Sequence, residues 1–172
     1  MPRLFSALAL AFALAACDSG SPPPPTTGSD GLLGSSHVTA EGATAGTFDG
    51  SAFVTVDANG AFILTLVSGP PHDLGPDHAG VVFATTHGQP GVGTYGLASS
   101  EEADDQLVGS YQERRSEGQS VVLLSDNGEI TITSSSEEGV EGHFTFAGTA
   151  LDETLQLIGE VTVRGTFDAP RL

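Results

Sequence analysis

From His37 onward, apolar and polar residues alternate along the chain, and this alternation is the feature that most constrains its fold. A period of two places successive side chains on opposite faces of a strand, whereas a helix requires a period of 3.6. The alternating runs cover residues 52–57, 61–67, 81–86, 93–97, 107–113, 120–124, 129–133, 140–151 and 155–167. We therefore predict an all-β domain with almost no helix after residue 17.

Turn residues separate these runs. Asn59-Gly60 lies between two β-rich runs and predicts a hairpin, because both residues tolerate a positive φ. Asp126-Asn127-Gly128 predicts a second hairpin, and Asp152-Glu153 a turn between the last two strands. Short strands in hairpin order indicate a single antiparallel meander. Such a meander closes into a β-barrel or a β-sandwich, and the pattern does not choose between them.

The residues before the alternating part have the features of an export signal. Arg3 precedes an apolar run, Leu4–Leu14, which has the length of a signal-peptide core and is too short to span a membrane. Leu14-Ala15-Ala16-Cys17 then resembles the lipobox of bacterial lipoproteins. That resemblance implies cleavage before Cys17 and a lipid on its sulfur, with Leu14, Ala15 and Ala16 as the recognition residues.

A linker is expected between the lipidated cysteine and the domain. Pro22–Pro25 should form a stiff polyproline II segment, and the Gly- and Ser-rich residues around it cannot bury enough apolar surface to fold. The predicted organisation is a signal peptide over residues 1–16, a lipidated cysteine and linker over 17–36, and an all-β domain over 37–172. The expected location is the cell envelope, on the periplasmic or cell-surface side, with the choice of membrane left open.

Charge excludes one class of partner. The chain has 22 acidic residues against 5 basic ones, and its formal net charge is −17. Nucleic-acid binding requires a basic face that neutralises phosphates, so we expect no nucleic-acid partner. The expected membrane contact is the lipid on Cys17, since an acidic surface is repelled by anionic headgroups.

Four stretches of the domain together resemble a family of small bacterial lipoproteins of unknown function. They are a G-T-Y strand, a G-x-I-x-I-T strand, a V-x-G-x-F-x-F strand and a closing G-T-F strand, at 93–95, 128–133, 140–146 and 161–168. His143 replaces the Thr or Ser that is more usual before the first Phe of the third motif. The resemblance implies an exported all-β domain and supplies no catalytic residues. Gly-Thr-Phe-Asp also occurs twice, at 46–49 and 165–168, which indicates two similar strand ends.

One loop could hold a metal ion. His72, Asp73, Asp77 and His78 are close together in a Pro- and Gly-rich stretch, and imidazole with carboxylate is a ligand set for zinc or another transition metal. Their spacing matches no familiar metal motif, and a solvated polar loop explains the same residues. If a metal binds, His72 and His78 are the ligands we expect first.

No arrangement in the sequence indicates catalysis. The nucleophile elbow and the zinc-protease helix motif are both missing from the sequence, so we expect a non-enzymatic protein without a cofactor. The leading interpretation is a lipid-anchored binding or structural domain. One alternative is a weak metal-binding or metal-dependent domain that uses the His72–His87 loop, and the other is a lipocalin-like carrier of a small apolar ligand. The interior decides between the leading interpretation and the carrier, because large side chains fill a small barrel and a carrier needs a cavity. The side chains expected to fill it are Phe53, Phe62, Phe83, Phe144, Phe146 and Phe167.

Overall fold

A computed structural model describes residues 33–69, 77–98, 106–115 and 119–172. These residues form ten strands and contain no helix. The strands are β1 (Gly34–Gly42), β2 (Gly46–Val56), β3 (Phe62–Ser68), β4 (His78–Thr85), β5 (Gly93–Gly96), β6 (Val108–Arg114), β7 (Ser120–Leu124), β8 (Asn127–Ser136), β9 (Gly139–Asp152) and β10 (Leu157–Pro170). The all-β prediction is confirmed, but none of the predicted runs covers β1, and β2 begins at Gly46, before the run predicted at 52–57.

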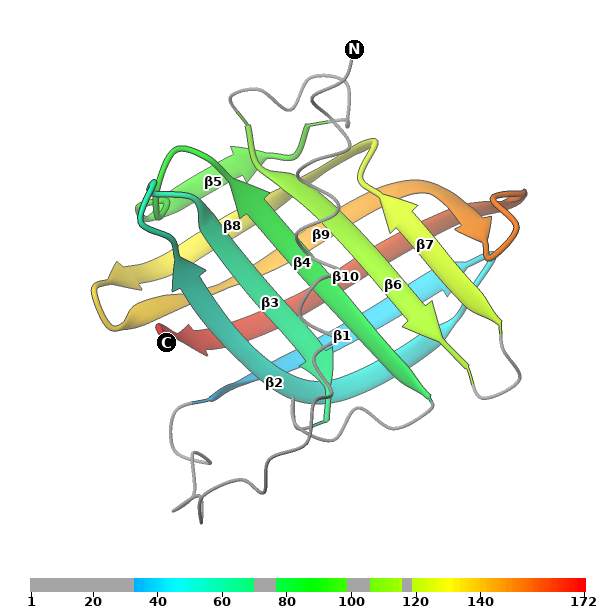
Figure 1. Ribbon diagram of the computed structural model, residues 1–172, viewed down its shortest axis with the longest axis horizontal. Coiled ribbons are helices and arrows are strands. Elements are labelled where there is room, and N and C mark those ends of the chain that lie inside the picture. The colour runs from blue at the N-terminus through cyan, green and yellow to red at the C-terminus, as the bar shows by residue number, and fades with distance from the viewer. Residues whose placement is uncertain (1–32, 70–76, 99–105, 116–118) are drawn as a thin grey trace, which may run out of the picture. The chain divides into compact units, whose positions relative to one another are not determined.

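Eight of the described strands close into an antiparallel barrel (Figure 1). Their order is β10-β1-β2-β3-β4-β6-β7-β9, and pairing of β9 with β10 completes the circle. One edge of β9 pairs with β10, and the other pairs first with β8 and then with β7. β5 lies on the far side of β8. Closure leaves the eight strands without a free edge, so the structure resolves the barrel-or-sandwich alternative as a barrel.

The predicted Asn59-Gly60 hairpin is confirmed between β2 and β3. The Asp57 carboxylate accepts hydrogen bonds of 2.8 Å from the backbone N–H groups of both Asn59 and Ala61. Gly60 has a φ of 87°, which an L-residue adopts only at a cost. The local sequence therefore sets both the turn and the register of this pair, as in other short hairpins.

The second predicted hairpin is wrong. β7 and β8 do not pair with each other, because both lie along the same edge of β9. Asn127 and Gly128 belong to β8, where they oppose Ala147 and Phe146. Gly128 has a φ of 140° and lies very close to the β9 backbone. Gly128 is therefore a site where two strands approach closely. The Asn-Gly dipeptide alone does not distinguish such a site from a turn.

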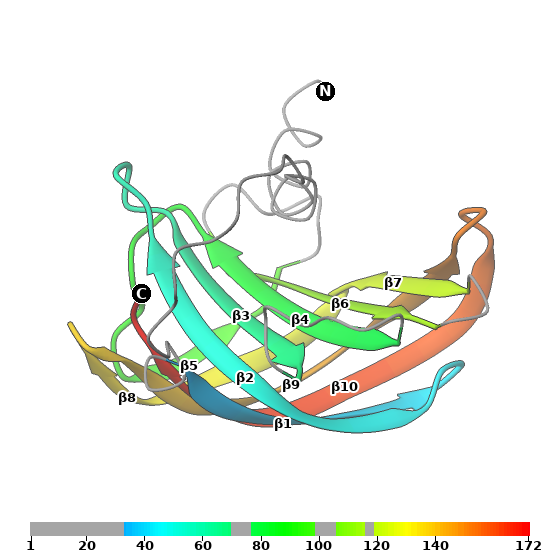
Figure 2. The ribbon, with the colours of Figure 1, turned by 60° about the horizontal axis from the view of Figure 1, so that its bottom comes forward.

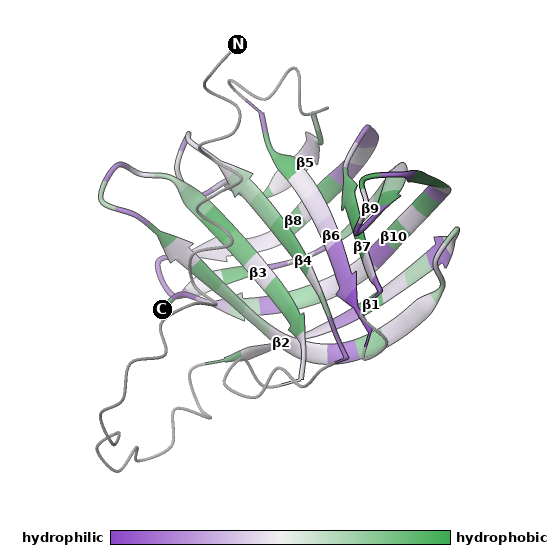
Figure 3. Cartoon of the chain, turned by 45° about the vertical axis from the view of Figure 1, so that its right-hand side comes forward, coloured by the Kyte–Doolittle hydropathy of each residue, from purple (hydrophilic) through white to green (hydrophobic). Residues whose placement is uncertain are grey.

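Alternation places the apolar side chains inside the barrel. Figure 3 shows hydrophobic and hydrophilic residues along β9 and β10. The largest fully buried side chains are Phe62, Phe83, Phe146, Leu64, Leu66, Leu123, Ile130, Ile132, Val38, Val54, Val81 and Val140. Phe144 and Phe167 are also buried, as predicted. Phe53 is a correction: Ala52 and Val54 take the inward positions of β2, so Phe53 faces outward and is only half-buried.

A second correction concerns the start of β10. Strict alternation along the last run predicts Leu157 on the face that carries Val161 and Val163, yet Leu157 is 73% exposed. The register with β9 shifts between Leu157 and Gly159, and this irregularity reverses the inward and outward positions before it. Leu155 in the preceding turn has a φ of 61° and is also exposed.

The part of the chain that the structure describes contains no helix that could span a membrane.

Candidate functional site

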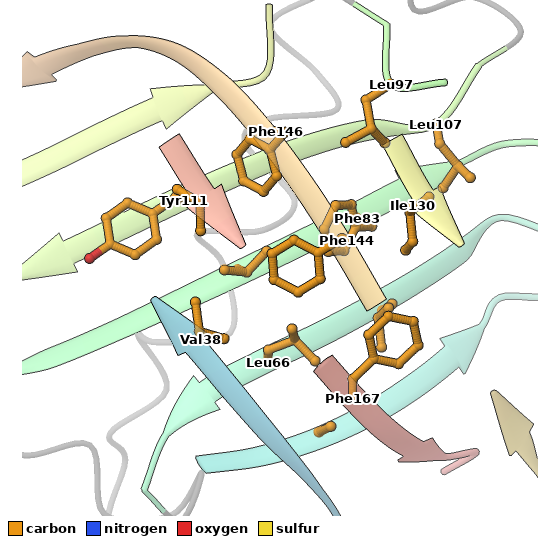
Figure 4. Close-up of a cluster of buried hydrophobic side chains, with 14 of the residues drawn as sticks. Val38, Leu66, Phe83, Leu97, Leu107, Tyr111, Ile130, Phe144, Phe146 and Phe167 are labelled. Atoms are coloured by element: carbon orange, nitrogen blue, oxygen red, sulfur yellow. The ribbon is translucent and has the colours of Figure 1, made fainter. Parts of the chain in front are cut away.

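Aromatic rings occupy the centre of the barrel (Figure 4). The Phe83 ring lies edge-on to Phe144 at 4.9 Å and to Phe146 at 5.8 Å between ring centroids. The Phe144 ring lies 6.5 Å from Phe167, nearly parallel to it. These separations are typical of well-packed aromatic clusters, in which edge-to-face contacts add to the energy of burial. The middle of the described interior is therefore filled by side chains.

A polar cluster closes one end of the barrel. Thr44, in the turn between β1 and β2, donates a 2.6 Å hydrogen bond to Oε2 of Glu113 at the end of β6. The Tyr111 hydroxyl donates to the same oxygen at 3.2 Å. Arg115 Nε donates to Oε1 at 2.7 Å, and its Nη2 donates to the Thr44 hydroxyl at 3.1 Å. The four side chains tie the β1–β2 turn across the barrel end, so we assign them a structural role.

This cluster predicts how stability depends on pH. Burial raises the pKa of Glu113, but hydrogen bonds from Arg115, Thr44 and Tyr111 outweigh it and leave the pKa below its ordinary value. A carboxyl with a lowered folded-state pKa stabilises the fold above its unfolded pKa of about 4.3, and this contribution is lost as the pH falls through the folded-state pKa. Burial, and then the nearby Glu113 charge, raise the pKa of Tyr111. The protonated Tyr111 therefore stabilises the fold below the unfolded-state pKa of about 10, and this stabilisation is lost as the pH rises above that value.

Glu113→Gln should lower the free energy of unfolding at neutral pH by about 1–2 kcal/mol, because it removes the charge from several hydrogen bonds. The variant should also lose less stability than the wild type between about pH 5 and pH 3. Urea unfolding at a series of pH values measures both effects. Equal acid slopes for the two proteins would show that Glu113 does not carry this dependence.

A depression of about 370 Å³ lies on the outer side of β10, β1 and β2. Its lining residues are Ser35, Ser36, His37, Asp49, Gly50, Thr166, Phe167 and Asp168. Within it, Nδ1 of His37 lies 2.7 Å from Oδ1 of Asp49. A carboxylate can only accept, so Nδ1 carries the proton of this bond. The side chains of the pair are 55% and 86% exposed, which makes them a solvated hydrogen-bonding pair.

The repeated Gly-Thr-Phe-Asp sequence is the one sequence signal that points to this depression. The two Gly-Thr-Phe-Asp stretches lie on the strands that flank β1, in β2 and β10. Asp49 opposes His37, and Asp168 opposes Ser35. The depression thus combines residues of β2 and β10 with residues of β1, which lies beside β10 in Figure 2. Strand pairing over so long a sequence separation is not readable from local pattern.

The predicted metal and lipidation residues lie only partly within the described residues. His72, Asp73 and the lipobox residues 14–17 lie outside them. Asp77 immediately precedes β4, and His78 begins β4 and opposes Arg114 of β6. Among the described residues, no group of three or more His, Cys, Asp or Glu side chains could hold a metal ion. Metal binding by this loop therefore stays a prediction.

Comparisons with family models, curated proteins and solved structures were made for the whole chain. None of the three found a match. The resemblance to small bacterial lipoproteins thus stays a prediction from motifs. Any functional conclusion has to come from the residues of this chain.

Proposed function

We propose that this chain is an exported lipoprotein whose β-barrel is a non-enzymatic binding or structural module of the cell envelope. The observation that carries the proposal is the aromatic packing of Phe83, Phe144 and Phe146 at the barrel centre. A carrier of the lipocalin kind holds its ligand where these rings lie. Filling this space favours a role for the outer surface and the rims over transport inside the barrel.

The boundaries of the barrel support the proposed tether. β1 begins at Gly34 and pairs with both β2 and β10, so the closed sheet needs no residue before it. The sequence of residues 18–32 is then available as a connection between a lipid on Cys17 and the domain. A diacylated cysteine with an acylated amine provides more than one chain, which is the condition for stable anchoring.

The His37–Asp49 pair supports binding better than catalysis. Both side chains are more than half exposed, so water screens their interaction and competes for their hydrogen bonds. Acid–base catalysis is favoured where burial and neighbouring charges tune the catalytic group. A solvated imidazole–carboxylate pair can instead supply hydrogen bonds to a bound ligand.

Replacing Cys17 with serine tests the anchor. Serine has no thiol to form the thioether, so we expect the variant to move from the membrane fraction to the soluble fraction and to retain residues 1–16. Fractionation, metabolic labelling with a fatty acid and mass spectrometry of the N-terminus measure these changes. Ser19→Ala, two residues away, is the matched control and should behave as the wild type. Unchanged fractionation and labelling of Cys17→Ser would contradict the proposal.

A further inference from the structure

Two turns of the barrel, β2–β3 and β9–β10, are held by the same set of hydrogen bonds. In each, the N–H of an aspartate donates to the carbonyl four positions later, and the N–H three positions later donates back to the aspartate carbonyl, at 2.9–3.0 Å. The two aspartates are Asp57 and Asp152, and each carboxylate also accepts from the backbone N–H groups two and four positions later. Both turns are therefore three-residue hairpin loops, in which the third loop residue is left-handed.

The third residue differs between the two loops. It is Gly60 with a φ of 87° in the first and Leu155 with a φ of 61° in the second. Glycine suits this position, because an L-side chain strains the backbone there. Among the described residues, Leu155 is the only non-glycine residue with a positive φ, and it is 78% exposed. The fold gains neither an unstrained backbone nor packing from this leucine, and such a departure from the local rule indicates a role outside the fold.

Two further aliphatic side chains lie beside Leu155. Leu157 is 73% exposed and Ile158 is 39% exposed, and the register with β9 shifts next to both of them. We call Leu155, Leu157 and Ile158 the apolar turn. Turns usually carry polar side chains, so three large aliphatic side chains in contact with water indicate a surface that is covered when the protein acts.

The length of the tether brings one surface within reach of the apolar turn. In Figure 1 this turn lies at the right-hand end of the barrel, and the C-terminal end of β10 lies at the left. Ser35 at the start of β1 opposes Asp168, which is eleven residues from Leu157 along β10, or about 36 Å. Residues 18–33 connect Cys17 to β1 and can extend over at most about 55 Å. The connection is therefore long enough for the apolar turn to reach the bilayer that holds a lipid on Cys17.

The chemistry of the turn fits the same surface. Aliphatic side chains enter the acyl-chain region of a bilayer without needing a partner of matching shape or a hydrogen bond. Residues 152–159 include two carboxylates, Asp152 and Glu153, and no basic side chain. Anionic headgroups therefore repel the turn, and zwitterionic headgroups do not. The Asp152 carboxylate is also held within the turn by its hydrogen bonds to Thr154 and Gln156.

We propose that the apolar turn inserts into the zwitterionic bilayer that carries the lipid anchor, and thereby fixes the orientation of the barrel on the membrane. This inference rests on the proposed function, since the tether and its lipid bring the turn to the bilayer. The diacylated cysteine holds the protein at the membrane, and the second contact, at the far end of β10, determines which side of the barrel faces away from it.

Fluorescence of the full-length protein in phosphatidylcholine vesicles tests the inference. The chain contains no tryptophan, so Leu157→Trp supplies a single reporter on the apolar turn. Val92→Trp is the matched control, because Val92 is 69% exposed and lies before β5, away from this turn. We expect the reporter at 157 to shift to shorter wavelength in vesicles and to be quenched by lipids brominated on their acyl chains. The reporter at 92 should do neither. Mixing in an anionic lipid should weaken the quenching at 157.

Leu155→Gly separates a membrane contact from a structural role. The variant gives the β9–β10 loop the same third residue as the β2–β3 loop, so the unfolding temperature should not fall. Burying one leucine contributes about tenfold to a partition equilibrium, so in Leu155→Gly/Leu157→Trp the ratio of inserted to free turn should fall about tenfold. Thermal unfolding and brominated-lipid quenching measure the two effects. A fall in the unfolding temperature with unchanged quenching would show that Leu155 is structural and would overturn the inference.

Three other results would also overturn it. They are no quenching at 157, equal quenching at 157 and 92, and a blue shift at 157 without quenching. The last result would show that a second copy or another part of the chain covers the turn.

These results are distinct from a failure of the proposed function, which mass spectrometry of the N-terminus and flotation with the vesicles measure first. A lipidated chain that floats without quenching at 157 would contradict the membrane contact of the apolar turn alone. A chain that carries no lipid and still floats with quenching at 157 would contradict the lipid anchor alone. A chain that carries no lipid and does not float would contradict both.

Discussion

Replacing Phe83 with alanine is expected to lower the free energy of unfolding by about 3–5 kcal/mol, the usual cost of removing a buried phenylalanine ring. Phe83 is fully buried and contacts both Phe144 and Phe146, so its loss opens a cavity that strands on opposite sides of the barrel cannot close. Domains of this size have about 5–15 kcal/mol of stability, so a large part of it would be lost. Urea unfolding followed by circular dichroism measures the change.

Phe53→Ala is the matched control for this prediction. Phe53 faces outward from β2 and is only half-buried, so its loss leaves no interior cavity. We expect a decrease in the free energy of unfolding of about 1 kcal/mol. Equal destabilisation by the two substitutions would contradict the inward and outward assignments of β2 and β4.

The second large effect is expected for Gly128→Ala. The added Cβ would lie 2.5 Å from both Cα and Cβ of Phe146, and closer still to the Thr145 carbonyl oxygen. The φ of 140° adds a conformational cost for any L-side chain. Backbone atoms of a central strand cannot move aside without loss of pairing. We therefore expect a decrease of about 3 kcal/mol or more in the free energy of unfolding, measured by urea or thermal unfolding.

Gly46→Ala supplies the comparison for this substitution. Gly46 begins β2, and a Cβ built there meets nothing within 4 Å. Its replacement should change the free energy of unfolding by about 0.5 kcal/mol or less, as for other open surface positions. If Gly128→Ala were equally mild, the close approach of β8 to β9 would be refuted.

The strands and most turns were predictable because their signals are local. Alternation identified nine of the ten described strands and missed β1, and Asn59-Gly60 identified the first hairpin together with its register. The turn after Asp152 was also readable, since its carboxylate accepts hydrogen bonds from the backbone of Thr154 and Gln156. In each case, residues within a few positions of one another decide the backbone conformation.

The rest depends on contacts between distant parts of the chain. Asn127-Gly128 has the composition of a hairpin turn, and only the path of β9 shows that it lies within a strand. Leu157 faces outward because the register with β9 shifts at the start of β10. Phe53 faces outward because its neighbour Ala52 takes the inward position of β2. Alternation alone determines neither arrangement. The depression that holds His37 and Asp49 requires β1 to pair with β10, which joins the two ends of the domain. A one-residue change in this register would move its outward-facing side chains to the inside.

A barrel filled with phenylalanine has few ways to act other than through its outside. Closure removes the free edges of the eight barrel strands, and the Thr44–Glu113–Arg115 cluster ties down the turn at one end. The sequence matches this difference between the inside and the outside of the barrel. The inward positions are apolar, and the outward positions carry threonine, histidine and charged side chains.

Two-dimensional NMR of the aromatic rings, recorded with and without a long-chain fatty acid, tests the filled barrel most directly. We predict nuclear Overhauser contacts of the Phe83 ring with the rings of Phe144 and Phe146, and ring resonances that do not shift when the fatty acid is added. Missing contacts between these rings, or saturable shifts confined to them as the fatty acid binds, would show a hollow barrel and contradict the account.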